Sequence, residues 1–370
     1  MKKVVSVIYS LSVAGAENVC LNISSNINKE KFEAYIITIF DEAPLLNQLQ
    51  NQENVKVISL GVPLKSRYWI FSPKVFLKFR KIVKSINPYA IHSHLWGVGT
   101  YLLLTIIGLG IKNRIATIHT SGGHYKSSYW FSKIDRNVEK WTYKLLNFRL
   151  VCVSEEVRKM ILQKLKILNP IKINNGVDLN YFNPIGNKQG VGSHYPVIVH
   201  VGRFLKAKNH WDMVRSLPAL KEKYPNFKMC FIGAGVEENL KEYCEENQIL
   251  DNVRFLGVTN NVVKYLNQAD IGLFQSTYEG LALALLEMMS CELPVVISDI
   301  PVFKEITEKG NCAKITSLHR IEEISESIIE LAGDKKQMKE LGKEGRRIIA
   351  EYFSQEKMVS AYEELYEKTF

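Results

Sequence analysis

The sequence lacks the residue spacings of a metal centre and of a disulfide framework. Its six cysteines are scattered, with no Cys-x-x-Cys pair and no metal-ligand spacing between cysteine and histidine. We therefore expect reduced core cysteines in a reducing compartment. A long apolar run is also missing, because the most apolar window, residues 101–111, is far shorter than the roughly 20 residues that span a bilayer.

The N-terminus loosely resembles a secretion signal. Lys2 and Lys3 precede an apolar run that leads to the small residues Ala14–Ala16. However, serines interrupt this run, and Glu17 follows as it would at the start of a helix. We expect a first strand with a glycine turn and a cytoplasmic protein, with peripheral association at the cytoplasmic face of the inner membrane as a further hypothesis.

Carboxylates are missing from much of the first half of the chain. Residues 54–134 contain twelve Lys and Arg residues and no Asp or Glu, and residues 1–185 carry 25 basic against 11 acidic residues. This imbalance indicates an anionic partner, either a membrane surface, a phosphorylated substrate or nucleic acid. A merely solvated surface is the alternative, but it would normally intersperse acidic residues.

Strand-like and helix-like segments alternate through both halves, and the strands are rich in β-branched residues. The pattern predicts an α/β protein of two Rossmann-like domains, each with a doubly wound parallel sheet, that face each other across a cleft. Ligands of such folds bind at the carboxyl ends of the strands. The polar segment Asn183–Tyr195 indicates the linker. The predicted domains are residues 1–185 and 186–350, with a final helix, 351–370, that packs back on the first domain.

Three finer predictions concern single elements. Residues 209–224 are expected to form one helix, and Ser154 is expected to cap the helix that follows it. The last helical stretch, 334–369, is expected to break near Ser354.

Residues 275–299 carry two carboxylates, Glu279 and Glu287, before a buried strand at Val295–Ser298. If residues 279–287 are all helical, the carboxylates lie roughly 12 Å apart. That distance is too long for a shared proton and suits two groups that hold opposite ends of one elongated polar ligand. A helix N-terminus between them favours a phosphate.

Arg203 and Lys208 lie in the loop that follows the strand beginning at Val197. Two cations at the carboxyl end of a strand, beside a helix start, are typical of a diphosphate site. Most loop cations are simply solvated, so this prediction depends on its combination with Glu279 and Glu287.

In combination, these residues resemble glycosyltransferase family 4, whose members are retaining enzymes of the GT-B fold. Gly202-Arg203 with Lys208, Glu279-x7-Glu287, and Pro294–Val296 carry the resemblance in the second half. The first half adds further matching segments: Ala14–Asn18, Ile91–His94, Thr117–His119, Val153–Glu155 and Asn174–Asp178.

The resemblance implies a role for each matching residue. Arg203 and Lys208 would neutralise the donor diphosphate, Glu279 would bind sugar hydroxyls, and Glu287 would bind the ribose. His119 would orient the reacting sugar through its side chain or backbone carbonyl, with a core histidine as the alternative; His92 and His94 fit a structural role better. The remaining residues implied to contact the donor lie in both halves. Gly15 would let the first loop approach the phosphates closely, and Gly280 would lie among the donor-binding residues. The amides of Leu281, Ala282 and Leu283 would contact the distal phosphate, and Leu256, Gly257 and Val258 would border the base.

The sequence departs from the family pattern at Ala14, Ala282 and Ala284, where glycine, glycine and proline are usual. These small changes put the donor preference in doubt. No Asp-x-Asp occurs, so the resemblance implies that no metal or other cofactor is required. No nucleophile is clearly placed, and the implied reaction is a same-face displacement in which the leaving diphosphate accepts the acceptor's proton.

The implied substrates are a nucleotide sugar, most simply a UDP-sugar, and a glycan or polyprenyl-diphosphate-linked acceptor in capsule, O-antigen or other surface polysaccharide assembly. The acceptor would bind the basic N-terminal half, where cations alternate with aromatic residues in 67–71, 74–84 and 125–131. This composition also suits an anionic inner-membrane surface. It carries no nucleic-acid recognition motif.

Two other functions are open. A nicotinamide-dependent dehydrogenase would need Gly-x-Gly-x-x-Gly, and Gly233-Ala234-Gly235 offers only its first two glycines. A catalytically silent protein of the same fold would bind a nucleotide sugar without turnover, although the intact Arg203, Lys208, Glu279 and Glu287 argue against it.

Overall fold

The computed structural model describes residues 1–12, 14–41, 55–64, 69–122, 125, 127–185, 195–235 and 238–368. Its contacts divide the chain into two compact units. Unit 1 comprises Met1–Gly176 and Gln355–Phe370, and unit 2 comprises Val177–Ser354. The predicted boundary at residue 185 lies within unit 2, and most of the predicted linker falls outside the described residues.

Unit 1 contains a seven-stranded sheet in the order β3-β2-β1-β4-β5-β6-β7, and all of its paired strands are parallel. The order runs outward in both directions from β1, as in a doubly wound fold. The strands are β1 (Lys2–Ile8), β2 (Phe32–Phe40), β3 (Val55–Val62), β4 (Ala90–Ser93), β5 (Asn113–Ile118), β6 (Arg149–Cys152) and β7 (Ile171–Lys172).

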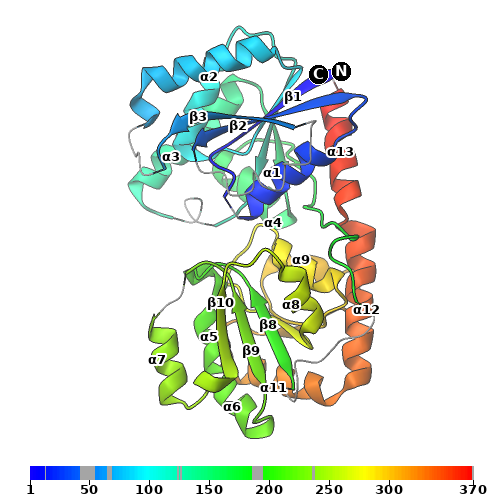
Figure 1. The fold of residues 1–370 in the computed structure, drawn as a ribbon. Helices are drawn as coiled ribbons and strands as arrows, with labels where there is room; N and C mark the ends of the chain where they lie inside the picture. The colour runs from blue at the N-terminus through cyan, green and yellow to red at the C-terminus, as the bar shows by residue number, and fades with distance from the viewer. Residues whose placement is uncertain are drawn as a thin grey trace. The chain divides into compact units, whose positions relative to one another are not determined.

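Unit 2 contains a six-stranded parallel sheet in the order β10-β9-β8-β11-β12-β13. Its strands are β8 (Val197–Val201), β9 (Lys228–Ile232), β10 (Val253–Gly257), β11 (Ile271–Phe274), β12 (Val295–Ser298) and β13 (Lys314–Thr316). The two parallel sheets confirm the predicted α/β architecture. Figure 1 shows the helices that accompany each sheet.

Within the described residues, helices lie between most successive strands of both units. The α-helices of unit 1 are α1 (Gly15–Asn26), α2 (Pro73–Ile86), α3 (Trp130–Leu145), α4 (Glu155–Met160) and α13 (Gln355–Glu367). Those of unit 2 are α5 (His210–Arg215), α6 (Leu217–Lys223), α7 (Glu238–Glu246), α8 (Val262–Gln268), α9 (Leu283–Ser290), α10 (Pro301–Thr307), α11 (Ile321–Gly333) and α12 (Lys335–Tyr352). Shorter helical segments are η2 (Trp69–Phe71), η3 (Gly97–Ile106), η5 (Ile161–Leu165), η6 (Lys206–Lys208) and η7 (Leu250–Asn252).

The cores form because the central strands are apolar on both faces. All four residues of β11 and all four of β12 are buried, so helices must cover both sides of the sheet. In unit 1 the last described helix, α13, packs against α1, although more than three hundred residues separate them in the chain.

Several local predictions are confirmed. The Ser154 side chain accepts a hydrogen bond from the Val157 amide and caps α4. The last helical stretch breaks between α12 and α13, at residues 353–354. The strand predicted at Val295–Ser298 has these same bounds.

Two helix predictions are wrong. Residues 209–224 form α5 and α6 rather than one helix, with a break at Ser216 just before Pro218, which has no amide hydrogen for a continuous helix. Residues 279–287 are not all helical, since α9 begins at Leu283, so the helical estimate of the separation between Glu279 and Glu287 does not apply.

A close approach of two backbones holds α12 against the end of α9. A Cβ atom added at Gly342 would lie 2.2 Å from the carbonyl oxygen of Glu292, a distance that van der Waals contact does not allow. One turn along α12, a Cβ atom at Gly345 would meet nothing closer than Met289 Cβ at 3.5 Å. The two glycines therefore differ in how much they constrain the packing.

We expect Gly342→Ala to lower the free energy of unfolding by about 1–3 kcal/mol, because α12 must shift away from Glu292. Gly345→Ala is the matched control and should leave stability unchanged or raise it by up to about 1 kcal/mol, since alanine favours the helix. Urea denaturation curves of both variants test the difference. Equal effects of the two substitutions would show that this backbone contact does not limit the packing.

Candidate active site

The centre of the candidate site in unit 2 is an ion pair between two predicted residues. Lys208 Nζ lies 2.6 Å from Glu279 Oε1, and the two side chains are only 18% and 14% exposed. Lys208 Nζ also lies 4.9 Å from the centroid of the Phe274 ring, within cation–π range. The resemblance assigns the two residues to different parts of the donor, yet here they contact each other. An ammonium group has three donors, so Lys208 can keep Glu279 and still bind an anion.

Hydrogen bonds fix the loop that carries Glu279. Ser276 Oγ donates to Glu279 Oε1 at 2.8 Å, and Ser298 Oγ, at the end of β12, donates to the Ser276 carbonyl at 2.6 Å. Thr277 N donates to the Ala207 carbonyl at 2.8 Å, which ties this loop to the one that carries Lys208. Ser276 is not among the residues predicted from the sequence; its position three residues before Glu279 was the available signal.

The loop with Arg203 is held by glycines at the ends of neighbouring strands. A Cβ atom at Gly233 would lie 2.0 Å from the Gly202 carbonyl oxygen, so only glycine fits there. Gly233 N donates in turn to the Gly257 carbonyl at 2.8 Å. The carboxyl ends of β8, β9 and β10 are thereby joined, while the Arg203 side chain is exposed.

At the start of α9, backbone amides rather than side chains are the groups that could bind a ligand. Leu281, Ala282 and Leu283 are buried, and Gly280 beside them is buried as well. The N-cap residue Ala282 has no side-chain oxygen to bond the first amides of the helix. The first amides of a helix have no partner within it, so they are the groups that a ligand at this point would meet.

Glu287 lies on α9 in a partly buried position. Desolvation raises the pKa of its carboxyl group to about 7, because burial disfavours the charged form. The carboxyl group is therefore only partly ionised near neutral pH. Of the three residues predicted beside the base, Leu256 and Gly257 end β10 and are partly exposed, and Val258 is exposed.

The predicted site residues of unit 1 are Gly15 and His119. Gly15 is the first residue of α1, and its N-cap, Ala14, has no capping side chain. His119 directly follows β5, and its Nε2 lies 2.8 Å from Nδ1 of His94, which directly follows β4. Burial lowers the pKa of His119 to about 4, so the imidazole is neutral at physiological pH.

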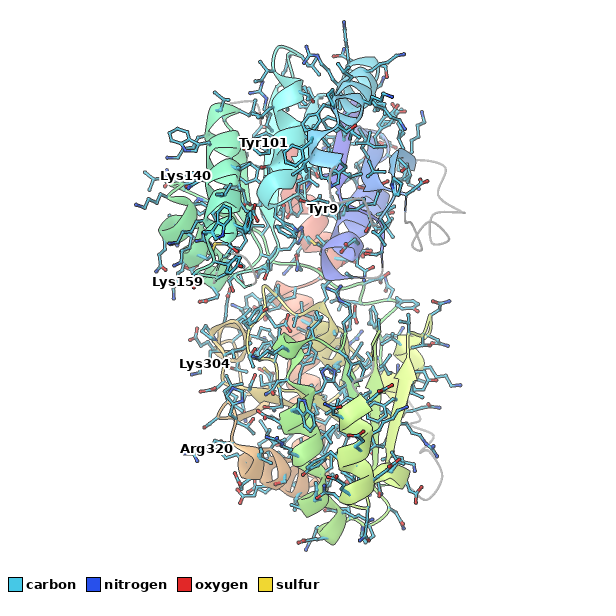
Figure 2. The ribbon with its side chains drawn as sticks, turned by 90° about the vertical axis from the view of Figure 1, so that its left-hand side faces the viewer. Tyr9, Tyr101, Lys140, Lys159, Lys304 and Arg320 are labelled. Atoms are coloured by element: carbon cyan, nitrogen blue, oxygen red, sulfur yellow. The ribbon has the colours of Figure 1, made fainter. Side chains whose placement is uncertain are left out.

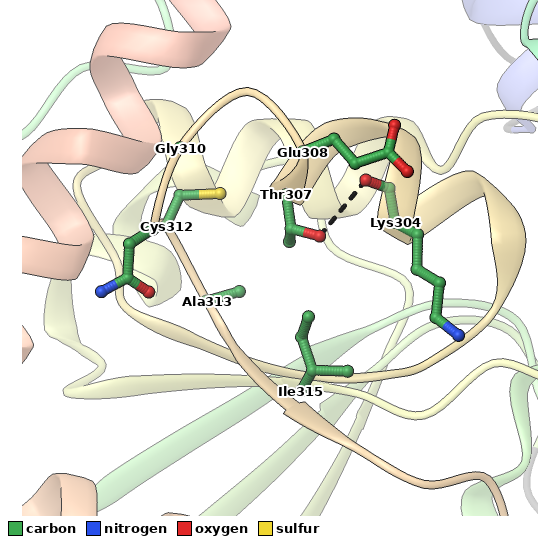
Figure 3. Close-up of a pocket in the computed structure, with 8 residues that line it drawn as sticks. Lys304, Thr307, Glu308, Gly310, Cys312, Ala313 and Ile315 are labelled. Atoms are coloured by element: carbon green, nitrogen blue, oxygen red, sulfur yellow. Dashed lines mark hydrogen bonds between the residues drawn. The ribbon is translucent and has the colours of Figure 1, made fainter.

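A separate hollow in unit 2 has a volume of about 470 Å³. Figure 3 shows its lining between α10 and β13, which includes Lys304, Cys312 and Ile315 and none of the predicted site residues. Its cation Lys304 is 3.6 Å from Asp299. The hollow is therefore distinct from the ion pair at Lys208.

Among the residues that the structure describes, no group of three or more His, Cys, Asp or Glu residues could hold a metal ion.

Comparison with known proteins identifies the class. The family profile "Glycosyl transferases group 1" matches residues 183–348, and "Glycosyltransferase Family 4" matches residues 13–181. The fold is the GT-B fold: HepE from Anabaena, solved in complex with UDP and glucose, superimposes with a TM-score of 0.80 over 98% of this chain and 99% of its own, at 16% identity. The chain belongs to glycosyltransferase family 4 and is a glycosyltransferase.

Two relatives span nearly the whole chain. An uncharacterized glycosyltransferase of Haemophilus influenzae is 24% identical over 98% of this chain and 99% of its own length. The UDP-Gal:alpha-D-GlcNAc-diphosphoundecaprenol alpha-1,3-galactosyltransferase of Escherichia coli is 24% identical over 96% of this chain and 94% of its own.

The raised pKa of Glu287 gives a stability prediction. The pKa of Glu287 in the folded protein, about 7, lies above the ordinary value of 4.5 for a glutamate. The contribution of this group to the free energy of unfolding is therefore complete below pH 4.5 and is lost as the pH rises through 7. We expect Glu287→Gln to be more stable than the parent protein by about 1–3 kcal/mol at pH 8 and to have no advantage at pH 4.5.

Urea denaturation across this pH range measures the effect. Glu326→Gln, at an exposed position of α11, is the matched control and should follow the parent protein at every pH. If the difference in the free energy of unfolding between Glu287→Gln and the parent protein is the same at every pH in this range, the pKa of Glu287 is not raised.

Proposed function

We propose that this glycosyltransferase is a retaining enzyme that transfers a sugar from a UDP-sugar to a polyprenyl-diphosphate-linked glycan in surface polysaccharide assembly. The observation that carries the proposal is the Lys208–Glu279 pair, which places a cation and a carboxylate together at the carboxyl end of a parallel sheet. A cation suits the donor diphosphate and a carboxylate suits sugar hydroxyls. The Escherichia coli relative, named for a UDP-galactose donor and a diphosphoundecaprenol-linked acceptor, supports the substrate classes.

Each end of the donor has a group suited to it in unit 2. Arg203 and Lys208 bind the diphosphate, the amides of Leu281–Leu283 bind the distal phosphate, and Glu279 binds the sugar. Glu287 binds the ribose, and residues 256–258 border the base. In unit 1, Gly15 allows close approach of the first loop, and His119 orients the reacting sugar.

The reaction follows from this assignment. The bond between the anomeric carbon and the diphosphate oxygen breaks, and the acceptor hydroxyl attacks from the same face, so the configuration is retained. The departing diphosphate oxygen accepts the hydroxyl proton, and Arg203 and Lys208 stabilise the negative charge that develops there. Because cations of the protein supply this stabilisation, the proposal includes no metal.

For a lipid-linked acceptor, we propose that one surface of unit 1 contacts the membrane. None of the described helices combines the length and apolar composition needed to cross a bilayer. Helix α3, however, exposes an apolar stripe at helical spacing, formed by Trp130, Ile134, Trp141 and Leu145. Trp141 is 66% and Leu145 68% exposed.

Lysines accompany this stripe. Lys133, Lys140 and Lys144 each precede a residue of the stripe by one position and form a second row beside it; Figure 2 labels Lys140. Apolar and cationic rows side by side suit insertion of the rings among lipid tails with ammonium groups at anionic headgroups. We propose that this surface, the α3 face, binds the inner membrane that carries the acceptor. Of the basic and aromatic segments expected to bind there (67–71, 74–84 and 125–131), residues 67, 68 and 126 lie outside the described residues.

A panel of UDP-, GDP- and ADP-sugars with a polyprenyl-diphosphate-linked acceptor extract tests the function. We expect transfer from a UDP-sugar with retained anomeric configuration, and the same rate in excess EDTA. Tight donor binding with neither transfer nor hydrolysis would instead favour the silent binding protein. Strict loss of transfer in EDTA would contradict the metal-free reaction.

Removal of either cation should slow the chemical step. We expect Arg203→Ala and Lys208→Ala each to lower kcat by about 100-fold, because a group that stabilises the leaving diphosphate is lost. Lys206→Ala, in the same loop and exposed, is the matched control and should keep the parent kcat. An unchanged kcat in Arg203→Ala or Lys208→Ala would remove that residue from the diphosphate site.

Vesicle sedimentation tests the α3 face. We expect the protein to sediment with anionic but not with neutral vesicles, and the double variant Trp141→Glu, Leu145→Glu to stay in the supernatant. Leu168→Glu, which changes another exposed leucine of unit 1 that lies outside α3, should sediment like the parent protein. Equal sedimentation of the double variant would show that α3 does not contact lipid.

A further inference from the structure

Two buried histidines of unit 1, His92 and His94, stand two residues apart at the end of β4 but have different surroundings. Their ring centroids lie 4.2 Å apart. Both ring nitrogens of His92 have partners: Nε2 lies 2.7 Å from Thr117 Oγ1, and Nδ1 lies 2.7 Å from the Tyr366 hydroxyl. His92 therefore connects the sheet to α13 and has no nitrogen left for another contact.

His94 is bonded on one side only. Its Nδ1 lies 2.8 Å from Nε2 of His119, and the two rings are stacked with centroids 5.1 Å apart. Within the described part of the chain, the other two ring nitrogens, His94 Nε2 and His119 Nδ1, are buried without a hydrogen-bond partner. Buried polar atoms without partners destabilise a fold, so their presence in a fixed geometry points to a use other than stability.

The backbone of His94 is held in place from both sides. His94 N donates to the Val7 carbonyl at 2.8 Å, and the next residue, Leu95, receives the Tyr143 hydroxyl on its carbonyl at 2.9 Å. The backbone of His94 is therefore fixed, and its ring gives the His119 ring a hydrogen-bond partner at a fixed position.

The bond between the two rings couples their tautomers. Each ring is neutral, because burial lowers the pKa of both groups, so the pair holds two protons in all. One ring must donate across the bond and the other must accept. If His94 Nδ1 carries the proton in this bond, His119 Nε2 accepts it, and the single proton of His119 lies on Nδ1, which can then donate. If His119 Nε2 carries the proton in the bond, His119 Nδ1 has none and can only accept. The protonation of His94 therefore decides whether His119 Nδ1 is a donor or an acceptor.

We propose that His94 is a positioning residue for this glycosyltransferase, which fixes the ring orientation and the tautomer of His119. The inference rests on the proposed role of His119 at the reacting sugar, and it gives the two histidines of the Ile91–His94 segment different functions. His94 acts through His119, whereas His92 stabilises the fold through α13.

Two amide substitutions test the proposal. The amide of His94→Asn occupies the place of Nδ1 and can still bond His119, whereas the longer His94→Gln places its amide near Nε2, away from His119. We expect His94→Asn to keep kcat within about 3-fold and His94→Gln to lower kcat by about 10- to 100-fold with little change in KM for the donor. Equal kcat values for two folded variants would overturn the proposal.

A control separates this effect from lost stability. Tyr366→Phe removes the hydroxyl that bonds His92 and should lower the Tm while kcat at a low temperature stays unchanged. A fall in kcat equal to that of His94→Gln would show that any disturbance of this cluster slows transfer, and would overturn the separate role of His94.

Imidazole nitrogen spectra give a readout that needs no activity. With ¹⁵N-labelled histidine, we expect a single tautomer of His119 in the parent protein and a mixture of two in His94→Gln. Mixed tautomers of His119 in the parent protein would overturn the proposal. Absence of transfer with every donor, together with a single tautomer, would instead refute the proposed function and leave the coupling of the two rings intact.

Discussion

The parallel pairing of every strand is the constraint on which the rest of the molecule depends. Parallel neighbours end at the same edge of a sheet, so the described loops that follow neighbouring strands gather there, and crossover segments return the chain to the opposite edge. Lys208 and Glu279 come from loops after β8 and β11, which are neighbours in the sheet, and they meet for this reason. His94 and His119 meet in unit 1 for the same reason, since β4 and β5 are neighbours.

Within each unit the polar residues at this edge are supported by hydrogen bonds to the next strand. Ser298 on β12 holds the carbonyl of Ser276, which holds Glu279, and Thr117 on β5 contacts His92 beside His94. The side chains proposed to contact the donor therefore stand on fixed neighbours. Such support lets partly buried charges keep one geometry without a ligand.

The sequence was sufficient for the architecture and for the types of group at the site. Alternation of β-branched and helical segments predicts both parallel sheets, and the Ser154 cap and the break near Ser354 follow from local rules. The helix predicted over 209–224 is two helices because Pro218 outweighs the apolar periodicity on both sides of it. The direct bond between Lys208 and Glu279 could not be read from the chain, because seventy residues separate them and only the order of the strands brings them together. The difference between His92 and His94 was also hidden, since it depends on Tyr366, far along the chain.

The position of α13 in unit 1 has a consequence for how the protein is made on the ribosome. Unit 2 is one continuous segment and can complete its fold as soon as it has emerged, whereas unit 1 must wait for a helix that is synthesised after unit 2. Until then Thr117 and His92 lack the hydroxyls of Tyr362 and Tyr366, and the first-made part of the chain is the last to be finished. A nascent chain interrupted before α13 therefore carries a finished unit 2 and an unfinished unit 1.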